Sequence, residues 1–171
     1  MRKRIVFLAT LTLGFISFVH LSVSANSRFE VKLERPAKSG IKEIDDFVTK
    51  SFDTYDESQK ITEDINFIRI EGDGTTTPKT IKNGKGEIIS KEAALVQFND
   101  LQSRIKKQND NIKTLQDLQK PAQESLKKCP MTQKLNATKV LGKGGEALNE
   151  VIKQTKTQAE LIEKQIAEIK K

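Results

Sequence analysis

Apolar residues recur every three or four positions in three stretches of the chain, the spacing of one face of an α-helix. We therefore predict helices over about 41–68, 90–128 and 146–170, with Ser39 and Ser90 as N-caps of the first two. The apolar positions are Ile41, Ile44, Phe47, Val48, Phe52, Tyr55, Ile61, Ile65 and Ile68 in the first helix; Ala94, Phe98, Leu101, Ile105, Ile112, Leu115, Ala122 and Leu126 in the second; and Leu148, Ile152, Thr155, Ala159, Ile162, Ile166 and Ile169 in the third.

The second predicted helix follows a seven-residue apolar repeat, which is typical of a helix that packs along a partner helix as in a coiled coil. Gln108 and Gln119 interrupt this seam, and buried polar residues in such a seam cost stability but fix register. The predicted fold is mainly α, either a three-helix bundle or a long coiled-coil hairpin with a helical lid. Because Ala, Thr and Gln leave a thin core, the seams also favour self-association or a protein partner.

The connections between the helices carry turn residues. Residues 71–89 predict a loop with a small β-hairpin, in which 80–82 pairs with 87–89 across Asn83-Gly84, because Asn-Gly supplies the positive φ values of tight hairpins. The glycine-rich segment 142–145 predicts a flexible linker before the third helix. Residues 26–40 predict an extended lead-in to the helical domain, which spans 41–171.

The first 25 residues have the three-part layout of a secretory signal peptide. A basic start, Arg2 to Arg4, precedes an apolar run over 5–21, and Val23 and Ala25 supply small residues at the cleavage position. We therefore expect cleavage near Ala25 and a periplasmic or secreted protein. The alternative is an uncleaved membrane anchor, since the apolar run approaches the ~20 residues of a membrane span.

Charge is distributed unevenly along the 146 residues that follow. Removal of 1–25 lowers the formal net charge from +7 to +4, because 27 basic and 23 acidic residues remain. The predicted helix over 41–64 is acidic, whereas 120–143 contains six lysines against Glu124. These lysines are Lys120, Lys127, Lys128, Lys134, Lys139 and Lys143.

Two interpretations of the lysine-rich segment remain open. Its charges either pair with the acidic first helix and are otherwise solvated, or they form a patch for an anionic partner such as phospholipid, lipopolysaccharide or an acidic protein. Nucleic acid is not an expected partner, because dedicated recognition uses arginine and aromatic stacking.

The chemistry of the expected exported chain excludes most catalysis. The only histidine of the full sequence, His20, lies in the predicted signal peptide. Residues 26–171 therefore lack the commonest general base and metal ligand. We therefore expect no catalytic residues, no metal and no cofactor. The single cysteine, Cys129, cannot close an internal disulfide. In an oxidising compartment it either links two chains or remains a half-buried thiol.

The sequence thus predicts an exported, non-enzymatic helical interaction protein of the cell envelope or extracellular space. One alternative is a periplasmic chaperone of the holdase type, by analogy of size and helical content only. The other is a protein that binds anionic membrane surfaces through 120–143.

Overall fold

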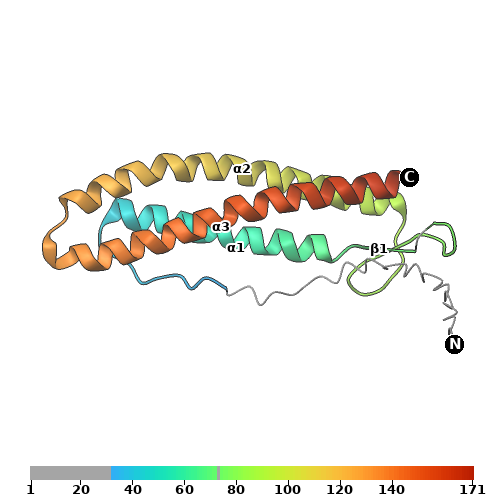
Figure 1. Cartoon of the computed structure of the whole chain (residues 1–171), viewed down its shortest axis with the longest axis horizontal. Coiled ribbons are helices and arrows are strands. Elements are labelled where there is room, and N and C mark those ends of the chain that lie inside the picture. Colours follow the sequence, from blue (N-terminus) through green and yellow to red (C-terminus); the bar gives the residue numbers. More distant parts are fainter. Residues whose placement is uncertain (1–31, 73) are drawn as a thin grey trace, which may run out of the picture. The chain divides into compact units, whose positions relative to one another are not determined.

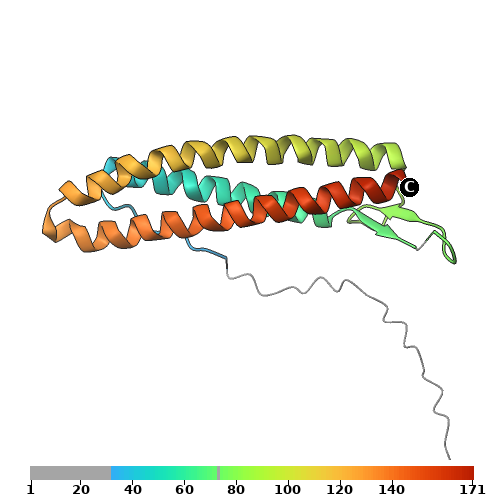
Figure 2. The same cartoon turned by 45° about the horizontal axis from the view of Figure 1, so that its top comes forward.

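Three long helices form most of the structure, a computed structural model that describes residues 32–72 and 74–171. In chain order the elements are α1 (Lys42–Asn66), β1 (Arg69–Glu71), β2 (Thr80–Lys82), α2 (Lys91–Lys128) and α3 (Met131–Lys170). Each helix packs against the other two, and they lie side by side (Figure 1, Figure 2). The predicted mainly α fold is confirmed as a three-helix bundle with a small hairpin between α1 and α2. The predicted signal peptide, 1–25, lies outside the described residues.

The described part of the lead-in runs along α1 without forming a helix or strand of its own. The backbone N–H of Leu33 donates to the Tyr55 hydroxyl at 3.3 Å. Arg35 Nη2 lies 2.7 Å from Asp53 Oδ1 and 3.1 Å from Asp56 Oδ2. These contacts fasten the segment to the acidic surface of α1.

The start of α1 is held by a carboxylate inside the helix. The expected N-cap, Ser39, is wrong: the cap position is Ile41, which makes no side-chain cap bond. Asp45 Oδ1 instead accepts from Ser39 N at 2.7 Å and Ser39 Oγ at 2.8 Å, and its Oδ2 accepts from Gly40 N at 3.1 Å. Gly40 has a φ of +83°, so the chain turns before the helix and Ser39 lies too early to cap it.

The cap predicted for α2 is confirmed. The Ser90 hydroxyl accepts a hydrogen bond from Ala93 N at 3.1 Å. The helix runs unbroken through Pro121 to Lys128, and Cys129 and Pro130 then form a tight connection to α3.

The predicted start of the third helix at 146 is wrong, because α3 begins at Met131 and includes the segment expected to be a linker. Gly144 is buried against α1, and a Cβ there would lie 2.7 Å from Val48 Cγ2 and 2.9 Å from Phe47 Cε1. The glycine therefore allows two helices to approach closely. This packing, together with burial of Ala137 and Val140, offsets the ~1 kcal/mol that each glycine costs in a helix.

The hairpin forms at the predicted place but with a different partner strand. β2 pairs antiparallel with β1, with Ile70 opposite Ile81, whereas the predicted partner 87–89 makes only a bridge from Ile88 to Lys82. The turn between β2 and residues 87–89 is tight, because Asn83 Oδ1 accepts from the backbone N–H groups of both Lys85 and Glu87 at 3.0 Å. The chain must enter α2 almost immediately afterwards, so this second ladder cannot extend.

The core consists of two apolar clusters. The first lies toward the α2–α3 connection and contains Ile44, Phe47, Val48, Phe52, Tyr55, Ile112, Leu115, Ala122, Ala137, Val140, Ala147, Leu148 and Val151. The second lies toward the hairpin and contains Ile61, Ile65, Ile68, Ile81, Ala94, Phe98, Leu101, Ile105, Ile162 and Ile169. In α3 the expected seam position Ile152 points outward, 39% exposed, and Val151 is buried instead.

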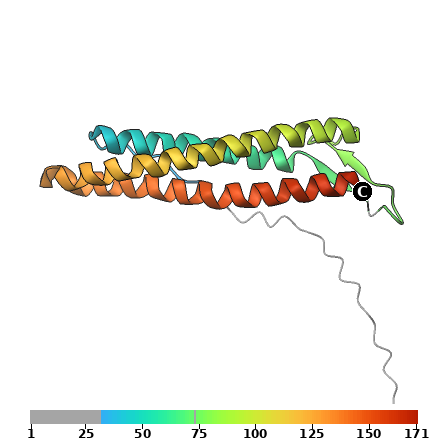
Figure 3. The same ribbon diagram turned by 90° about the horizontal axis from the view of Figure 1, so that it is seen from above.

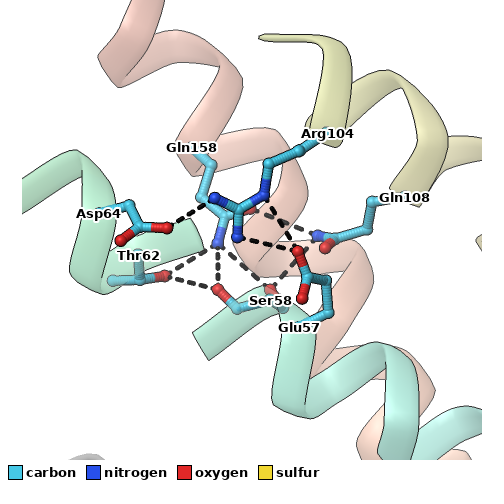
Figure 4. A network of polar contacts seen from close by, with 7 residues as sticks. All are labelled: Glu57, Ser58, Thr62, Asp64, Arg104, Gln108 and Gln158. Carbon is cyan, nitrogen blue, oxygen red and sulfur yellow. Dashed lines mark hydrogen bonds and ion pairs between the residues drawn. The ribbon is translucent and has the colours of Figure 1, made fainter. Parts of the chain in front are cut away.

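A layer of buried polar side chains separates the two clusters along the helices. Figure 4 shows part of it, with Ser58, Gln108 and Gln158 from the three helices. Gln108 Nε2 donates to Thr155 Oγ1 at 2.5 Å and to Gln158 Oε1 at 3.3 Å. Gln158 Nε2 donates to the Ser58 carbonyl at 2.8 Å and to Thr62 Oγ1 at 2.8 Å. The layer joins all three helices, and Gln108 interrupts the α2 seam as predicted. At its rim, Arg104 bridges Glu57 and Asp64 from α1.

Candidate functional site

The α2–α3 connection forms the end of the bundle opposite the hairpin. Three views agree that this connection extends past the start of α1 (Figure 1, Figure 2, Figure 3). It consists of the last turns of α2, the residues Cys129 and Pro130, and the first turns of α3. We call residues 120–143 the lysine end, because all six candidate lysines belong to it.

The structure brings these lysines onto two neighbouring helix ends. Lys120, Lys127 and Lys128 belong to α2, and Lys134, Lys139 and Lys143 belong to α3. All are exposed except Lys134, which is half-buried. Lys143 Nζ lies 2.7 Å from Glu146 Oε2, so its charge is partly compensated within α3. Because α3 begins at Met131, Lys134, Lys139 and Lys143 lie on a continuous helix and not on a flexible linker.

Two helix dipoles of opposite sign meet at the lysine end. The first turn of α3 contains no acidic residue, so the partial positive charge of its free N–H groups faces outward uncompensated by a side chain of that turn. Lys127 and Lys128 occupy the last turn of α2, where the helix dipole is negative and favours cations. The two helix dipoles offset one another at this end, so its positive sign is set by the lysine side chains.

Two large apolar side chains at the same end were missed by sequence reasoning. Met131 is 81% exposed and Leu135 is 69% exposed. They lie four residues apart on α3 and so share a helix face, away from the buried stripe of Ala137 and Val140. Their four-residue spacing indicates a shared face only if the segment is helical, and residues 131–145 were not predicted to be helical.

Cys129 lies in the connection itself. Its thiol is half-buried against the first apolar cluster and donates to the Leu126 carbonyl at 3.2 Å. The thiol is therefore engaged within its own turn, and a disulfide between chains remains a prediction.

Among residues 32–72 and 74–171, no three His, Cys, Asp or Glu side chains are grouped so that they could hold a metal ion. None of the helices in this part of the chain combines the length and apolar character needed to cross a membrane.

In comparisons with known proteins, no family, no curated protein and no solved structure matches the chain.

Proposed function

We propose that the protein is an exported, non-enzymatic binding module that holds an anionic partner at its lysine end. The observation that carries the proposal is the placement of six lysines, with a single acid in 120–143, on two adjoining helix ends. Lysines concentrated at one end produce a local positive potential that attracts an anion, although the formal net charge of residues 26–171 is only +4.

Self-association through the helical seams is the alternative, but few of the predicted seam positions are exposed to a second chain. The seam positions of α2, from Ala94 to Ala122, are buried against α1 and α3 of the same chain. Several acidic residues in the first half of α1 have partners outside the lysine end: Asp46 pairs with Lys42, and Asp53 and Asp56 pair with Arg35. These contacts support a lysine end that is available to a partner.

A charge-neutralising variant with a matched control tests the proposal. The variant K127Q/K128Q/K139Q removes three exposed lysines from the lysine end, and K106Q/K107Q/K156Q removes three exposed lysines from elsewhere on α2 and α3. Binding of fluorescently labelled heparin to residues 26–171 is measured by anisotropy at low salt, with circular dichroism to check folding.

We expect the first variant to lose about 100-fold in affinity, at ~1 kcal/mol per lysine near an anionic surface, and the control to lose far less. Equal losses in both variants would show that only net charge matters and would remove the case for a site.

A further inference from the structure

We propose that the lysine end docks end-on to an anionic phospholipid bilayer, with Met131 and Leu135 entering the boundary between headgroups and acyl chains. This inference rests on the proposed function, because it names the anionic partner as a membrane surface. It adds a role for two apolar side chains that charge alone leaves unexplained.

The first step is the exposure of the apolar pair. Single exposed apolar residues are common on protein surfaces. Met131 and Leu135 differ because they are neighbours on one helix face, 81% and 69% exposed, at the extreme end of the bundle. A partner that supplies only negative charge gives these side chains no apolar environment. A bilayer supplies both.

The second step is the order of side chains along α3. Met131, Leu135, Lys139 and Lys143 follow one another at four-residue intervals, so they form a single stripe that starts at the end of the helix. Each interval advances about 6 Å along the axis. The apolar pair therefore comes first and the lysines follow about 6 and 12 Å behind Leu135. Helices that lie in the interface bury their apolar faces about 5–10 Å deep. Insertion of Met131 and Leu135 to a comparable depth would leave Lys139 and Lys143 near the lipid phosphates.

The third step is the charge beside the apolar pair. Lys127 and Lys128 end α2 on the other side of the connection, and Lys134 lies between Met131 and Leu135 in sequence and is half-buried. Long lysine side chains can lay their methylene groups along apolar surface while the ammonium group stays at the polar interface. The apolar pair is thus flanked by cations from both helices.

Other partners fit less well. Residues 120–143 contain neither arginine nor an aromatic residue, so the stacking and forked hydrogen bonds that favour nucleic acid are absent from this segment of the sequence. A second copy would bring two lysine-rich ends together and repel. An acidic protein would pair with the lysines and leave Met131 without an apolar partner unless it also offered an apolar pocket.

The experiment uses residues 26–171, which retain the whole compact unit Leu33–Lys171 and both described apolar clusters. Because the chain has no tryptophan, a single introduced indole reports on its own surroundings. The reporter is Leu135→Trp, and its control is Val96→Trp near the start of α2, where Val96 is 68% exposed, almost the same as Leu135. Vesicles contain phosphatidylcholine with or without phosphatidylglycerol.

We expect the Leu135→Trp emission to shift to shorter wavelength with phosphatidylglycerol vesicles and to be quenched by lipids brominated near the headgroup, while Val96→Trp stays unchanged. We also expect Met131→Ser/Leu135→Ser to weaken vesicle binding about tenfold or more, from the lost apolar burial, with heparin binding unchanged.

The outcomes separate the two proposals. Heparin binding at the lysine end without vesicle binding would overturn the membrane inference and leave the proposed function standing. Vesicle binding in which Leu135→Trp does not shift, or in which both reporters shift alike, would overturn end-on docking. If K127Q/K128Q/K139Q and its control K106Q/K107Q/K156Q lose heparin affinity equally, and vesicles shift neither tryptophan, both proposals are overturned.

Discussion

Gly144 illustrates how a single residue sets the distance between two helices. Its missing side chain leaves room for Val48 and Phe47 of α1, with a hypothetical Cβ only 2.7 Å from Val48 Cγ2. Gly142 and Gly145, in the same helix, have nothing within 4 Å of the equivalent position. Three glycines close together in sequence therefore have different roles, and only the buried one is needed for packing.

Replacing Gly144 by alanine should destabilise the bundle. The added methyl group overpacks the α1–α3 contact at a cost of about 1–3 kcal/mol, which exceeds the ~1 kcal/mol gained from better helix propensity. The matched control Gly142→Ala should raise the free energy of unfolding by up to about 1 kcal/mol. Urea denaturation of both variants measures the difference, and a Gly144→Ala protein as stable as Gly142→Ala would contradict the close approach.

Local residue chemistry was predictable where the partner is close in sequence. The Ser90 cap needs only Ala93, three residues away, and it was found. Gly144 could not be interpreted in the same way, because its contacts Phe47 and Val48 lie almost a hundred residues earlier. A glycine that supports close packing and a glycine that loosens a linker have the same sequence signature until the opposing helix is known.

Among the elements, the hairpin depends most on contacts outside itself. β1 and β2 contain three residues each, which is too little for independent stability. Lys79, next to β2, donates to Glu168 Oε1 at 2.5 Å and so ties the hairpin to the end of α3. This ion pair lowers the pKa of Glu168 below its ordinary 4.5, chiefly through the hydrogen bond from Lys79.

Docking of the hairpin should therefore weaken in acid. A carboxyl whose pKa is lowered on folding contributes its full stabilisation above its ordinary pKa of 4.5 and loses it as the pH falls through the lowered value. We expect amide hydrogens of β1 and β2 to lose protection over this range. Glu168→Gln should remove that part of the pH dependence and leave the hairpin weakly protected throughout. Identical pH profiles for the two proteins would contradict the role of the ion pair.

Periodicity predicted the helices and the buried faces of α1 and α2, but not the helix ends, the burial of Val151 in place of Ile152, or the strand pairing. Ile68 fits the spacing of the first helix, yet the structure ends α1 at Asn66 and buries Ile68 on the way into β1. In α3, Ile152 and Val151 are adjacent apolar residues, and only the position of the other helices decides that Val151 is buried. Met131 and Leu135 went unnoticed for the same reason, since their exposure depends on a helix boundary set by packing.

At the scale of the whole molecule, the apolar stripes of the helices are used within one chain. Most seam positions of α2 and α3 are buried among the three helices, so the apolar seams that favoured self-association are covered within one chain. The polar layer completes the core with hydrogen bonds at Gln108 and Gln158 rather than with apolar contact.

Residues 26–171 should therefore be a monomer in reductant. Light scattering gives the mass directly, and Cys129→Ser gives the control without a thiol. Because the Cys129 thiol is half-buried and hydrogen-bonded to Leu126, crosslinking without reductant should be slow. A dimer or trimer that persists in Cys129→Ser would contradict internal use of the seams.

The polar layer also separates the bundle into two halves that can unfold partially and independently. Apolar cohesion stops at Ser58, Gln108 and Gln158 and resumes beyond them, so the two clusters share few apolar contacts through this layer. Partial opening of a protein follows such boundaries, and each cooperative unit has its own free energy. The hairpin half can fray while the half that bears the lysine end keeps its shape. The lysine end is thus insulated from fluctuations at the far end of the same helices.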